Sequence, residues 1–331
     1  MTPEARPSAT MVADGAGITT SKAARALKVA ALVALLVIVP PLAGHPYITT
    51  IFISALMFGV LGAIYDLMLG YAGLANFGYA GFIAAGAYGS ALASFHYGVS
   101  PWFGLLIGGF CGGLMGLFTG LITLRLKGLY LGLTTWFIAE ALRFTIANTP
   151  EYTRGVLGLA VAPFPNLFGI DFARGQLLHY YYLLLVLGAL ILIAMQLLVS
   201  SKIGLAFRAI REDQLATESL GLNATRYKLI NFTVACCFTG VIGSFYAHYL
   251  GILSPTPEEF GVPRTVEILT IAYVGGRGTL WGALFAGFLL IGFQEYFREL
   301  EAWRLVMFGT LLILVMMFAP KGLAGLRKYL W

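Results

Sequence analysis

The chain has 331 residues, of which 59% are apolar and only 11% are Asp, Glu, Lys or Arg, and its formal net charge is +6. A typical soluble domain is about 25% charged, so this composition excludes soluble, disordered, nucleic-acid-binding and disulfide-scaffold proteins. A membrane-spanning helix needs about 20 apolar residues, and four stretches of at least that length contain no charged residue: 29–65, 67–124, 175–201 and 229–257. We therefore predict an all-α polytopic membrane protein surrounded by lipid.

The N-terminal residues 1–27 are polar and mildly basic, and the apolar run after them meets Pro40 and Pro41 without a convincing cleavage site. We expect an uncleaved tail rather than a signal peptide. Apolar stretches bounded by charges, prolines and glycines predict spans at 28–44, 47–67, 73–95, 101–124, 128–147, 178–199, 229–252 and 303–319.

Residues 262–297 are also apolar, but Gly275-Gly276-Arg277-Gly278 divides them into two short arms. The arms form either two tilted crossings or a re-entrant pair. Counting both as crossings gives about ten spans in a transmembrane domain at 28–319, followed by a tail at 320–331. An even number of crossings places both termini on the same side of the membrane.

The charges predict which side that is. Fifteen of the 21 basic residues, but only six of the 15 acids, fall on the termini and turns of the common side. The positive-inside rule makes this side cytoplasmic. We therefore expect cytoplasmic termini, a cytoplasmic segment at 201–228 and a periplasmic loop at 148–176.

Glycine recurs every four residues in the predicted fourth span, at Gly104, Gly108, Gly112, Gly116 and Gly120. This spacing puts the glycines on one helix face. Such a stripe allows two backbones to approach closely in lipid. We interpret it as helix packing in a tight bundle rather than as the wall of a wide pore.

No set of residues in the sequence suggests catalysis. The four histidines lack the spacing of metal ligands, and neither G-x-S-x-G nor H-E-x-x-H occurs. The dipeptide Gly-Lys is absent, so the chain has no Walker A loop. We expect no enzyme, no metal site and no cofactor in this chain; any ATP and Mg²⁺ used in its function would be bound by partner chains.

The most informative polar segment runs from Ser201 to Lys228 and is charged and amphipathic, with Gly221 where a short helix would end. We expect a compact helix–turn–helix that docks a soluble partner, although an ordinary solvated connector remains open. Here the sequence resembles the LivM-type permease family of bacterial branched-chain amino acid ABC importers. The resemblance implies a segment that couples the permease to an ATPase, and Thr217 stands where Ala is expected. The residues concerned are Gly204, Arg208, Ala209, Ile210, Arg211, Glu212, Asp213, Glu218 and Gly221.

The resemblance covers roughly 45–326. It includes the glycine-rich stretch 70–88, where Asn76 replaces the usual Ser, and the stretches 125–143, 249–282 and 320–326. It implies a type II-like importer permease in the bacterial inner membrane. Its implied partners are a second, LivH-type permease chain, two ATPase chains and a periplasmic binding protein.

The resemblance also implies that the substrate is a branched-chain or other hydrophobic amino acid. Arg154 departs from the family pattern, because TRGVLGL at 153–159 carries it where the family tends to have glycine. Permeases for urea, short amides or aromatic acids are similar relatives, so these substrates stay open.

Five polar or aromatic residues inside the predicted spans are candidates for the translocation path. Glu140 and Arg143 are three residues apart on one helix face, and Trp136 lies one turn earlier. A charge at the bilayer centre costs about 2.5–3.5 kcal/mol on insertion scales, so the pair either lies beside the path or satisfies itself. Asn76 and Tyr79 begin the third span, where exposed backbone would bind substrate unless the glycines serve only packing.

The break at Gly275, Gly276 and Gly278 is a further candidate, as a gate element or as a simple cytoplasmic turn. Embedded acids and interrupted helices also occur in ion-coupled secondary transporters. A stand-alone secondary transporter is therefore the alternative to an ABC importer subunit.

Overall fold

A computed structural model describes residues 37–42, 44–126, 128–167, 169–173 and 175–297. It also describes seven isolated positions, which are Val306, Gly309, Thr310, Ile313, Leu314, Met317 and Gly322. The chain divides into two compact units, residues 1–49 and 50–331. In the first unit, residues 37–42 are helical, and the amide of Thr49 donates a hydrogen bond to the carbonyl of His45.

The secondary structure is almost entirely helical, which confirms the all-α prediction. The helices are α2 (Pro46–Asp66), a π-helical continuation η1 (Leu67–Tyr71), α3 (Tyr79–Tyr97), α4 (Pro101–Thr123), α5 (Leu129–Ala147), α6 (Pro150–Thr153), the 3₁₀ turn η2 (Gly155–Leu157), α7 (Leu177–Ser200), α8 (Lys202–Glu212), α9 (Gln214–Ser219), α10 (Ala224–Leu250), α11 (Pro257–Phe260), α12 (Val262–Gly275) and α13 (Leu280–Tyr296). Two short strands, β1 (Leu159–Ala160) and β2 (Ile252–Leu253), pair antiparallel with Leu159 opposite Leu253.

Four helices among the described residues are long and apolar enough to cross a membrane: Pro46–Tyr71, Pro101–Thr123, Leu177–Ser200 and Ala224–Leu250. The pair Pro257–Gly275 and Leu280–Tyr296 makes a fifth if it is counted as one span, and it bends by 119° at the predicted glycine break. The predicted spans 28–44 and 303–319 and both tails lie wholly or largely outside the described residues.

Two predicted boundaries are wrong for local reasons. The third span was expected from residue 73, but α3 begins at Tyr79, because Gly73 takes a left-handed conformation (φ 69°) and residues 73–76 have no regular structure. The span expected from residue 229 begins at Ala224, since Asn223 caps α10: its side-chain oxygen accepts a hydrogen bond from the amide of Arg226 at 3.0 Å.

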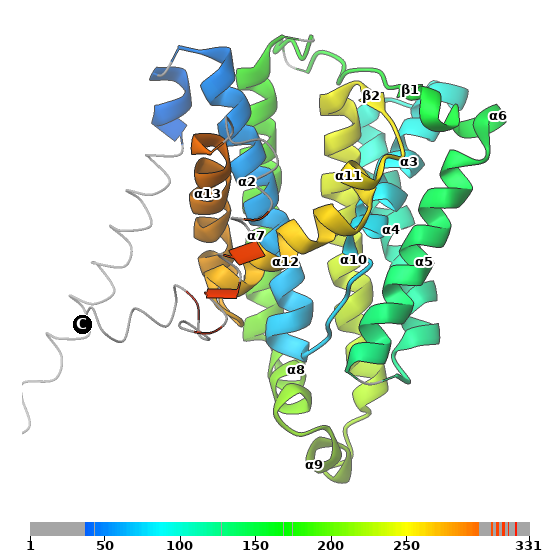
Figure 1. Cartoon of the computed structure of the whole chain (residues 1–331), viewed down its shortest axis with the longest axis vertical. Helices are drawn as coiled ribbons and strands as arrows, with labels where there is room; N and C mark the ends of the chain where they lie inside the picture. Colours follow the sequence, from blue (N-terminus) through cyan, green and yellow to red (C-terminus); the bar gives the residue numbers. More distant parts are fainter. Residues whose placement is uncertain are drawn as a thin grey trace, which may run out of the picture. The chain divides into compact units, whose positions relative to one another are not determined.

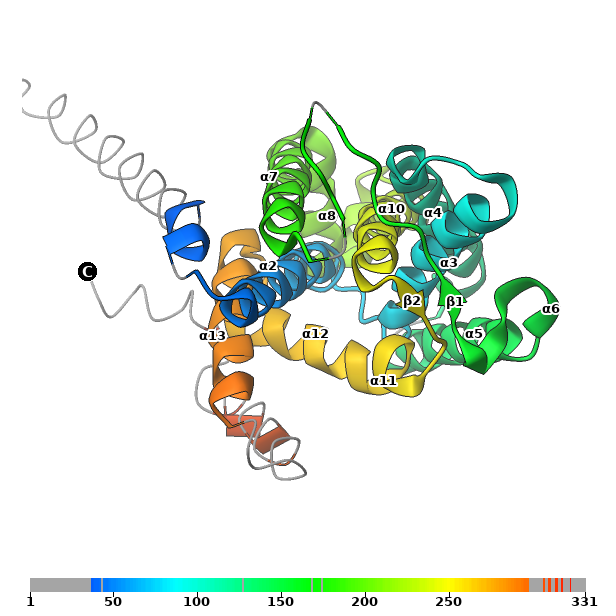
Figure 2. The same ribbon diagram turned by 90° about the horizontal axis from the view of Figure 1, so that it is seen from above.

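Helix α10 lies beside α3 and α4, and both views of the ribbon show this grouping (Figures 1 and 2). The glycine stripe of α4 faces α10, and a Cβ added at Gly112 or Gly240 would overlap the facing backbone. The opposite face of α4 exposes large apolar side chains, including Phe103, Phe110 and Phe118. The packing interpretation of the stripe is therefore confirmed, and the apolar outer face suits a lipid environment.

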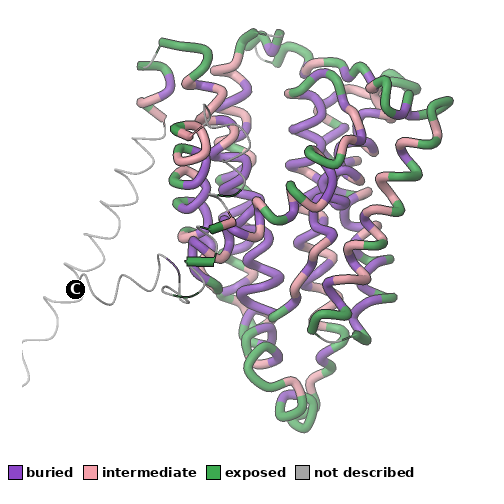
Figure 3. The backbone as a smooth tube through the Cα atoms, in the orientation of Figure 1, coloured by how far each residue is buried: buried purple, intermediate pink, exposed green. Residues whose placement is uncertain are grey.

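Helix α2 lies beside α7 and α13, and glycines also permit its close contacts (Figures 1 and 2). A Cβ on Gly287 of α13 would overlap Gly59 of α2, and a Cβ on Gly62 would overlap Ile271 of α12. Burial is deepest along α2, α3 and α10, whereas α9 is largely exposed (Figure 3). The core of the bundle thus lies between these three helices.

The loop expected to be periplasmic and the segment expected to be cytoplasmic lie at opposite ends of the bundle. The β1–β2 pair stands at the top of Figure 1, and α8 and α9 stand at the bottom. Residues 148–176 contribute β1, and residues 201–228 contribute α8 and α9. The side of the membrane that each segment faces stays a prediction.

Arg154 has a φ of 58°, and no other described residue except glycine has a positive φ. This conformation favours glycine, which is the residue expected at this position from the resemblance. The guanidinium of Arg154 lies 5.3 Å from the centre of the Phe95 ring, an interaction that contributes about 0.5–1 kcal/mol.

We expect Arg154→Gly to be close to neutral, because relief of the left-handed backbone offsets the lost ring contact. Arg154→Val should lower the free energy of unfolding by about 1–3 kcal/mol, since a β-branched residue is strained at this φ. Thermal unfolding of the two variants in detergent measures the difference. Equal midpoints for the valine and glycine variants would contradict the argument.

Candidate functional site

The segment expected to dock a partner forms a helix–turn–helix, which we call the α8–α9 hairpin (residues 201–223). Ser201 caps α8 by accepting a hydrogen bond from the amide of Ile203 at 3.2 Å. Asp213 ends α8 and caps α9, where its side chain accepts a hydrogen bond from the amide of Ala216 at 3.1 Å. Gly221 follows with a φ of 86°, so the local prediction of two short helices is confirmed.

One face of the hairpin is anchored to the bundle. Phe207 and Ile210 are buried, and a Cβ at Gly204 would overlap the backbone of Val199 at the end of α7. Arg208 donates a hydrogen bond to the carbonyl of Val199 at 3.2 Å, and its guanidinium lies 5.5 Å from the centre of the Tyr71 ring. The first helix of the hairpin is therefore held at a fixed position against the bundle.

Thr217, which replaces an expected alanine, is buried, and its hydroxyl donates to the carbonyl of Asp213 at 2.6 Å. This internal hydrogen bond satisfies the hydroxyl within α9. The position therefore accepts Thr without leaving a buried polar group unpaired.

The other face of the hairpin is exposed (Figure 3). Leu215 and Leu220 are 69% and 84% exposed, which is unusual for leucines that pack against their own chain. The acids Glu212, Asp213 and Glu218 are exposed beside them, and Ala209 is half-buried. Exposed apolar side chains with a charged border are typical of protein interaction sites.

The hairpin reaches the bundle interior through Arg211. Its guanidinium donates a hydrogen bond to the carbonyl of Gly70 in η1. In the same region, Asp66 is fully buried, and its carboxylate accepts a hydrogen bond from the amide of Gly278 at 2.9 Å. We call Asp66, Gly70, Arg211 and Gly278 the junction. It connects the end of α2, the α8–α9 hairpin and the turn between α12 and α13.

The junction depends on irregular backbone. Side chains from other helices donate hydrogen bonds to the carbonyl groups of η1. Asn231 of α10 donates to the carbonyl of Leu67 at 2.9 Å, and Arg211 donates to the carbonyl of Gly70. Single π-helical turns of this kind are frequent at functional sites. A Cβ at Gly70 would overlap both the Asp66 carboxylate and the Gly278 amide, so only glycine fits there.

Sequence reasoning placed Arg211 and Gly278 among the functional residues but missed Asp66 and Gly70. A signal was available, because Asp66 is the single charged residue between two long uncharged stretches. An ionisable residue at membrane depth is by default a candidate for function.

Asn76 and Tyr79 are both fully buried and take part in hydrogen bonds inside the bundle. Asn76 accepts a hydrogen bond from the Gly78 amide at 3.0 Å, and its carbonyl accepts one from the Tyr65 hydroxyl at 3.1 Å. Tyr79 donates to the carbonyl of Leu61 at 3.1 Å and accepts from the Thr239 hydroxyl at 2.7 Å. The Asn76 bonds hold the loop between η1 and α3, and the place of both residues on the translocation path stays a prediction.

Glu140 and Arg143 form an ion pair at 2.7 Å. Arg143 also donates to the carbonyl of Pro255 at 3.2 Å and lies over the ring of Phe144 at 4.5 Å. Trp136 stacks on Phe137 with ring centres 5.5 Å apart. The pair satisfies its own charges, which matches the alternative weighed from the sequence, and its place on the translocation path stays a prediction.

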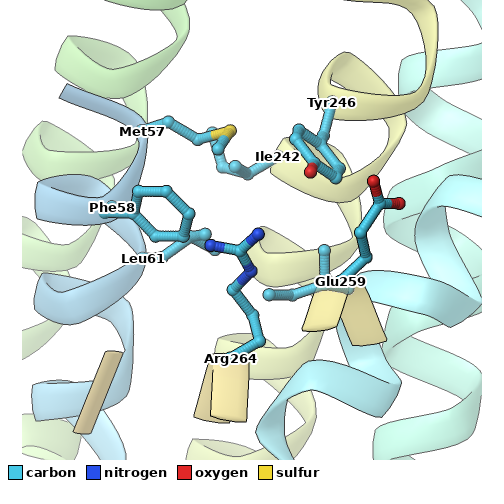
Figure 4. A pocket seen from close by; sticks show the side chains of 8 residues that line it. Met57, Phe58, Leu61, Ile242, Tyr246, Glu259 and Arg264 are labelled. Carbon is cyan, nitrogen blue, oxygen red and sulfur yellow. The ribbon is translucent and has the colours of Figure 1, made fainter. Parts of the chain in front are cut away.

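A pocket with room for the centre of a water-sized sphere over about 10 Å³ lies between α2, α3, α10, α11 and α12 (Figure 4). Five apolar residues, one tyrosine and two charged residues line it, namely Met57, Phe58, Leu61, Ile83, Ile242, Tyr246, Glu259 and Arg264. None of the eight residues predicted for the translocation path lines this pocket. The sequence analysis missed it because its lining comes from five separate helices.

The family assignment rests on similarity along most of the chain. The family described as "Branched-chain amino acid transport system / permease component" matches residues 47–319. The chain belongs to this permease family. The α8–α9 hairpin, the junction and the pocket all lie within the matched residues.

Curated relatives agree with this assignment. The permease is 32% identical to the high-affinity branched-chain amino acid transport system permease protein LivM of Salmonella typhimurium over 81% of this chain and 68% of that protein. The LivM protein of Escherichia coli matches to the same extent. LivH of Escherichia coli is 29% identical over 38% of this chain and 40% of its own length. No solved structure matches the permease.

The family and the apolar helices make the permease a multi-pass inner-membrane transport protein. A permease for a different solute is also similar to this chain: the fructose import permease protein FrcC of Rhizobium meliloti is 25% identical over 67% of this chain and 63% of that protein. Family membership therefore leaves open which solute this permease carries.

Proposed function

We propose that this permease is a transmembrane subunit of an ATP-driven importer of branched-chain or other hydrophobic amino acids. A periplasmic binding protein delivers the substrate, a second, LivH-type permease chain completes the pathway, and two ATPase chains bind and hydrolyse ATP with Mg²⁺. Both termini of the permease lie in the cytoplasm. The relatives LivM and LivH, which are both permease proteins of a branched-chain amino acid transport system, support a paired permease.

The α8–α9 hairpin carries the proposal. It presents exposed Leu215 and Leu220 outward, while Arg211 holds it to the carbonyl of Gly70 inside the bundle. An ordinary solvated connector needs neither feature. The hairpin is exposed on one face and is hydrogen-bonded on the other to η1, the irregular end of a spanning helix. This arrangement suits the transfer of motion from an ATPase to the translocation pathway.

The junction supports a route for that motion. Displacement of α8 by the ATPase pulls on η1 through Arg211, and the Asp66–Gly278 hydrogen bond passes the displacement to the turn between α12 and α13. Coupling between the docking hairpin and the pathway requires an element with two conformations, and both sites must shift the equilibrium between them. We propose that the break at Gly275, Gly276 and Gly278 acts as the cytoplasmic gate.

Reconstitution tests this function directly. We expect proteoliposomes containing the permease, a LivH-type chain and the ATPase chains to accumulate radiolabelled leucine when ATP and the loaded binding protein are present. Uptake should fall to background when the ATPase chains or ATP are omitted. Uptake by the permease alone under a proton or sodium gradient would instead establish an ion-coupled secondary transporter.

A second experiment distinguishes hydrophobic amino acids from the other candidate substrates. Thermal-shift screening of the binding protein against leucine, urea, short amides and aromatic acids identifies the delivered ligand. Stabilisation by urea, an amide or an aromatic acid, with no response to leucine, would replace the proposed substrate while keeping the ABC importer mechanism.

A further inference from the structure

The pocket combines an apolar wall with two opposite charges. Met57, Phe58, Leu61, Ile83 and Ile242 supply the wall, and all five are buried. Glu259 and Arg264 supply the charges, from α11 and α12 (Figure 4). The space admits the centre of a water-sized sphere over only about 10 Å³, which is room for about one water molecule. An amino acid therefore enters only when the surrounding helices move apart.

The two charged groups are only partly satisfied by the protein. One carboxylate oxygen of Glu259, Oε2, is buried and has no hydrogen-bond partner among the described residues. Arg264 pairs with Glu267 at 2.8 Å through Nη1 and lies over the Phe58 ring at 4.7 Å. A guanidinium has five N–H donors, so donors on Arg264 remain for a ligand. A buried unpaired carboxylate oxygen calls for an explanation.

The charged groups also lie apart from each other. Among the described residues, Arg264 forms its ion pair with Glu267 and none with Glu259. In Figure 4 the guanidinium of Arg264 turns toward Phe58, whereas the carboxylate of Glu259 lies on the side of Tyr246. The pocket therefore offers a negative and a positive group at two separate points above an apolar floor.

We propose that this pocket is a transit site for a zwitterionic amino acid with an apolar side chain. Glu259 receives the ammonium group, Arg264 receives the carboxylate, and the side chain packs against the α2, α3 and α10 residues. The inference rests on the proposed function and adds the binding residues to it. Two opposite charges discriminate among the open substrates, because urea has no charge and an aromatic acid brings an anion with nothing for Glu259 to bind.

The position of the pocket fits a transit site. Met57, Phe58 and Leu61 lie near the middle of the span Pro46–Tyr71. Helix α11 closely follows strand β2, which pairs with β1 of the loop expected on the periplasmic side. A solute released at that loop meets Glu259 first and then the mid-membrane wall, with the junction still between it and the cytoplasmic end.

Equilibrium binding tests the proposal without the binding protein, which would otherwise impose its own selectivity. The complete transporter in lipid nanodiscs, nucleotide-free and ATP-bound, is titrated with radiolabelled leucine. Unlabelled leucine, isocaproate (leucine without its ammonium group) and leucinamide (leucine without its carboxylate) compete for the site. We expect leucine to compete at least tenfold better than either analogue in the wild-type transporter.

Two conservative variants test which group of the ligand Glu259 and Arg264 each bind. Glu259→Gln should abolish the preference for leucine over isocaproate while keeping the preference over leucinamide. Arg264→Lys keeps the positive charge beside Glu267 but removes the guanidinium fork, so it should reduce the preference over leucinamide. The neighbouring exposed Glu258 provides the matched control, and Glu258→Gln should bind like the wild type. A merely structural effect would not change one analogue preference selectively.

The outcomes separate the two proposals. Leucine binding and analogue preferences that are unchanged in Glu259→Gln and Arg264→Lys overturn the pocket while leaving an ATP-driven importer intact. Absence of saturable leucine binding to the wild type in both nucleotide states also overturns the pocket. Absence of ATP-driven leucine uptake by the reconstituted wild-type transporter overturns the proposed function and the pocket together.

Discussion

Replacing Arg211 with Ala is expected to lower ATP-driven substrate uptake by the assembled transporter at least tenfold. The substitution removes the hydrogen bond from the α8–α9 hairpin to the carbonyl of Gly70. A hydrogen bond that involves a charged group contributes about 1.5–3 kcal/mol, and each 1.4 kcal/mol is about tenfold in an equilibrium. Uptake and ATP hydrolysis measured in the same proteoliposomes should show hydrolysis that no longer drives transport.

Glu212→Ala separates docking from the junction, because Glu212 is the next residue but its side chain is 78% exposed on the docking face. Its contact with Arg211 is a loose one at 3.9 Å, and exposed pairs of this kind contribute about 0–1 kcal/mol. The double variant should lose at least as much uptake as Arg211→Ala alone. Normal uptake in the double variant would show that the hairpin is only a connector, and equal losses in the two single variants would point to docking rather than to the junction.

Replacing Gly240 with Ala is expected to lower the free energy of unfolding strongly. Gly240 lies where α10 crosses α4, and an added Cβ would overlap the carbonyl oxygen of Gly108. Inserting a methyl group into well-packed helices typically costs about 1–3 kcal/mol and occasionally more. Because backbone atoms on both sides form this contact, the two helices must separate. The thermal midpoint in detergent and the yield of folded protein should both fall.

Gly292→Ala in α13 is the matched control, since a Cβ there meets nothing within 4 Å. Alanine favours a helix over glycine by about 1 kcal/mol, so this variant should be as stable as the wild type or slightly more stable. A Gly240→Ala variant that unfolds at the wild-type temperature would show that the α4–α10 crossing tolerates separation.

The site residues predicted from the sequence differ in how well the structure supports them. Glu140 and Arg143 could be recognised as a pair from their spacing alone, because residues three apart share a helix face. That spacing could not reveal the other contacts of Arg143, which are with Pro255 from another segment and with Phe144 on its own helix. Asn76 accepts hydrogen bonds from Tyr65 and Gly78, and its place on the translocation path stays a prediction.

The sequence by itself determined the features that repeat or act over a few residues. The long uncharged stretches indicated the spans, the four-residue glycine spacing indicated a packing face, and Gly221 indicated where a short helix ends. Each depends on composition or on helical periodicity, which neighbours in the chain share.

Only the tertiary structure determines which residues come together in the junction and in the pocket. Asp66, Arg211 and Gly278 lie far apart in the chain, and the bend between α12 and α13 brings Gly278 to Asp66. Glu259 and Arg264 become a candidate binding pair only when α2 and α10 place apolar side chains beside them. These contacts between distant residues depend on how the helices cross. Helix crossings follow from packing across the bundle rather than from the sequence pattern along any one helix.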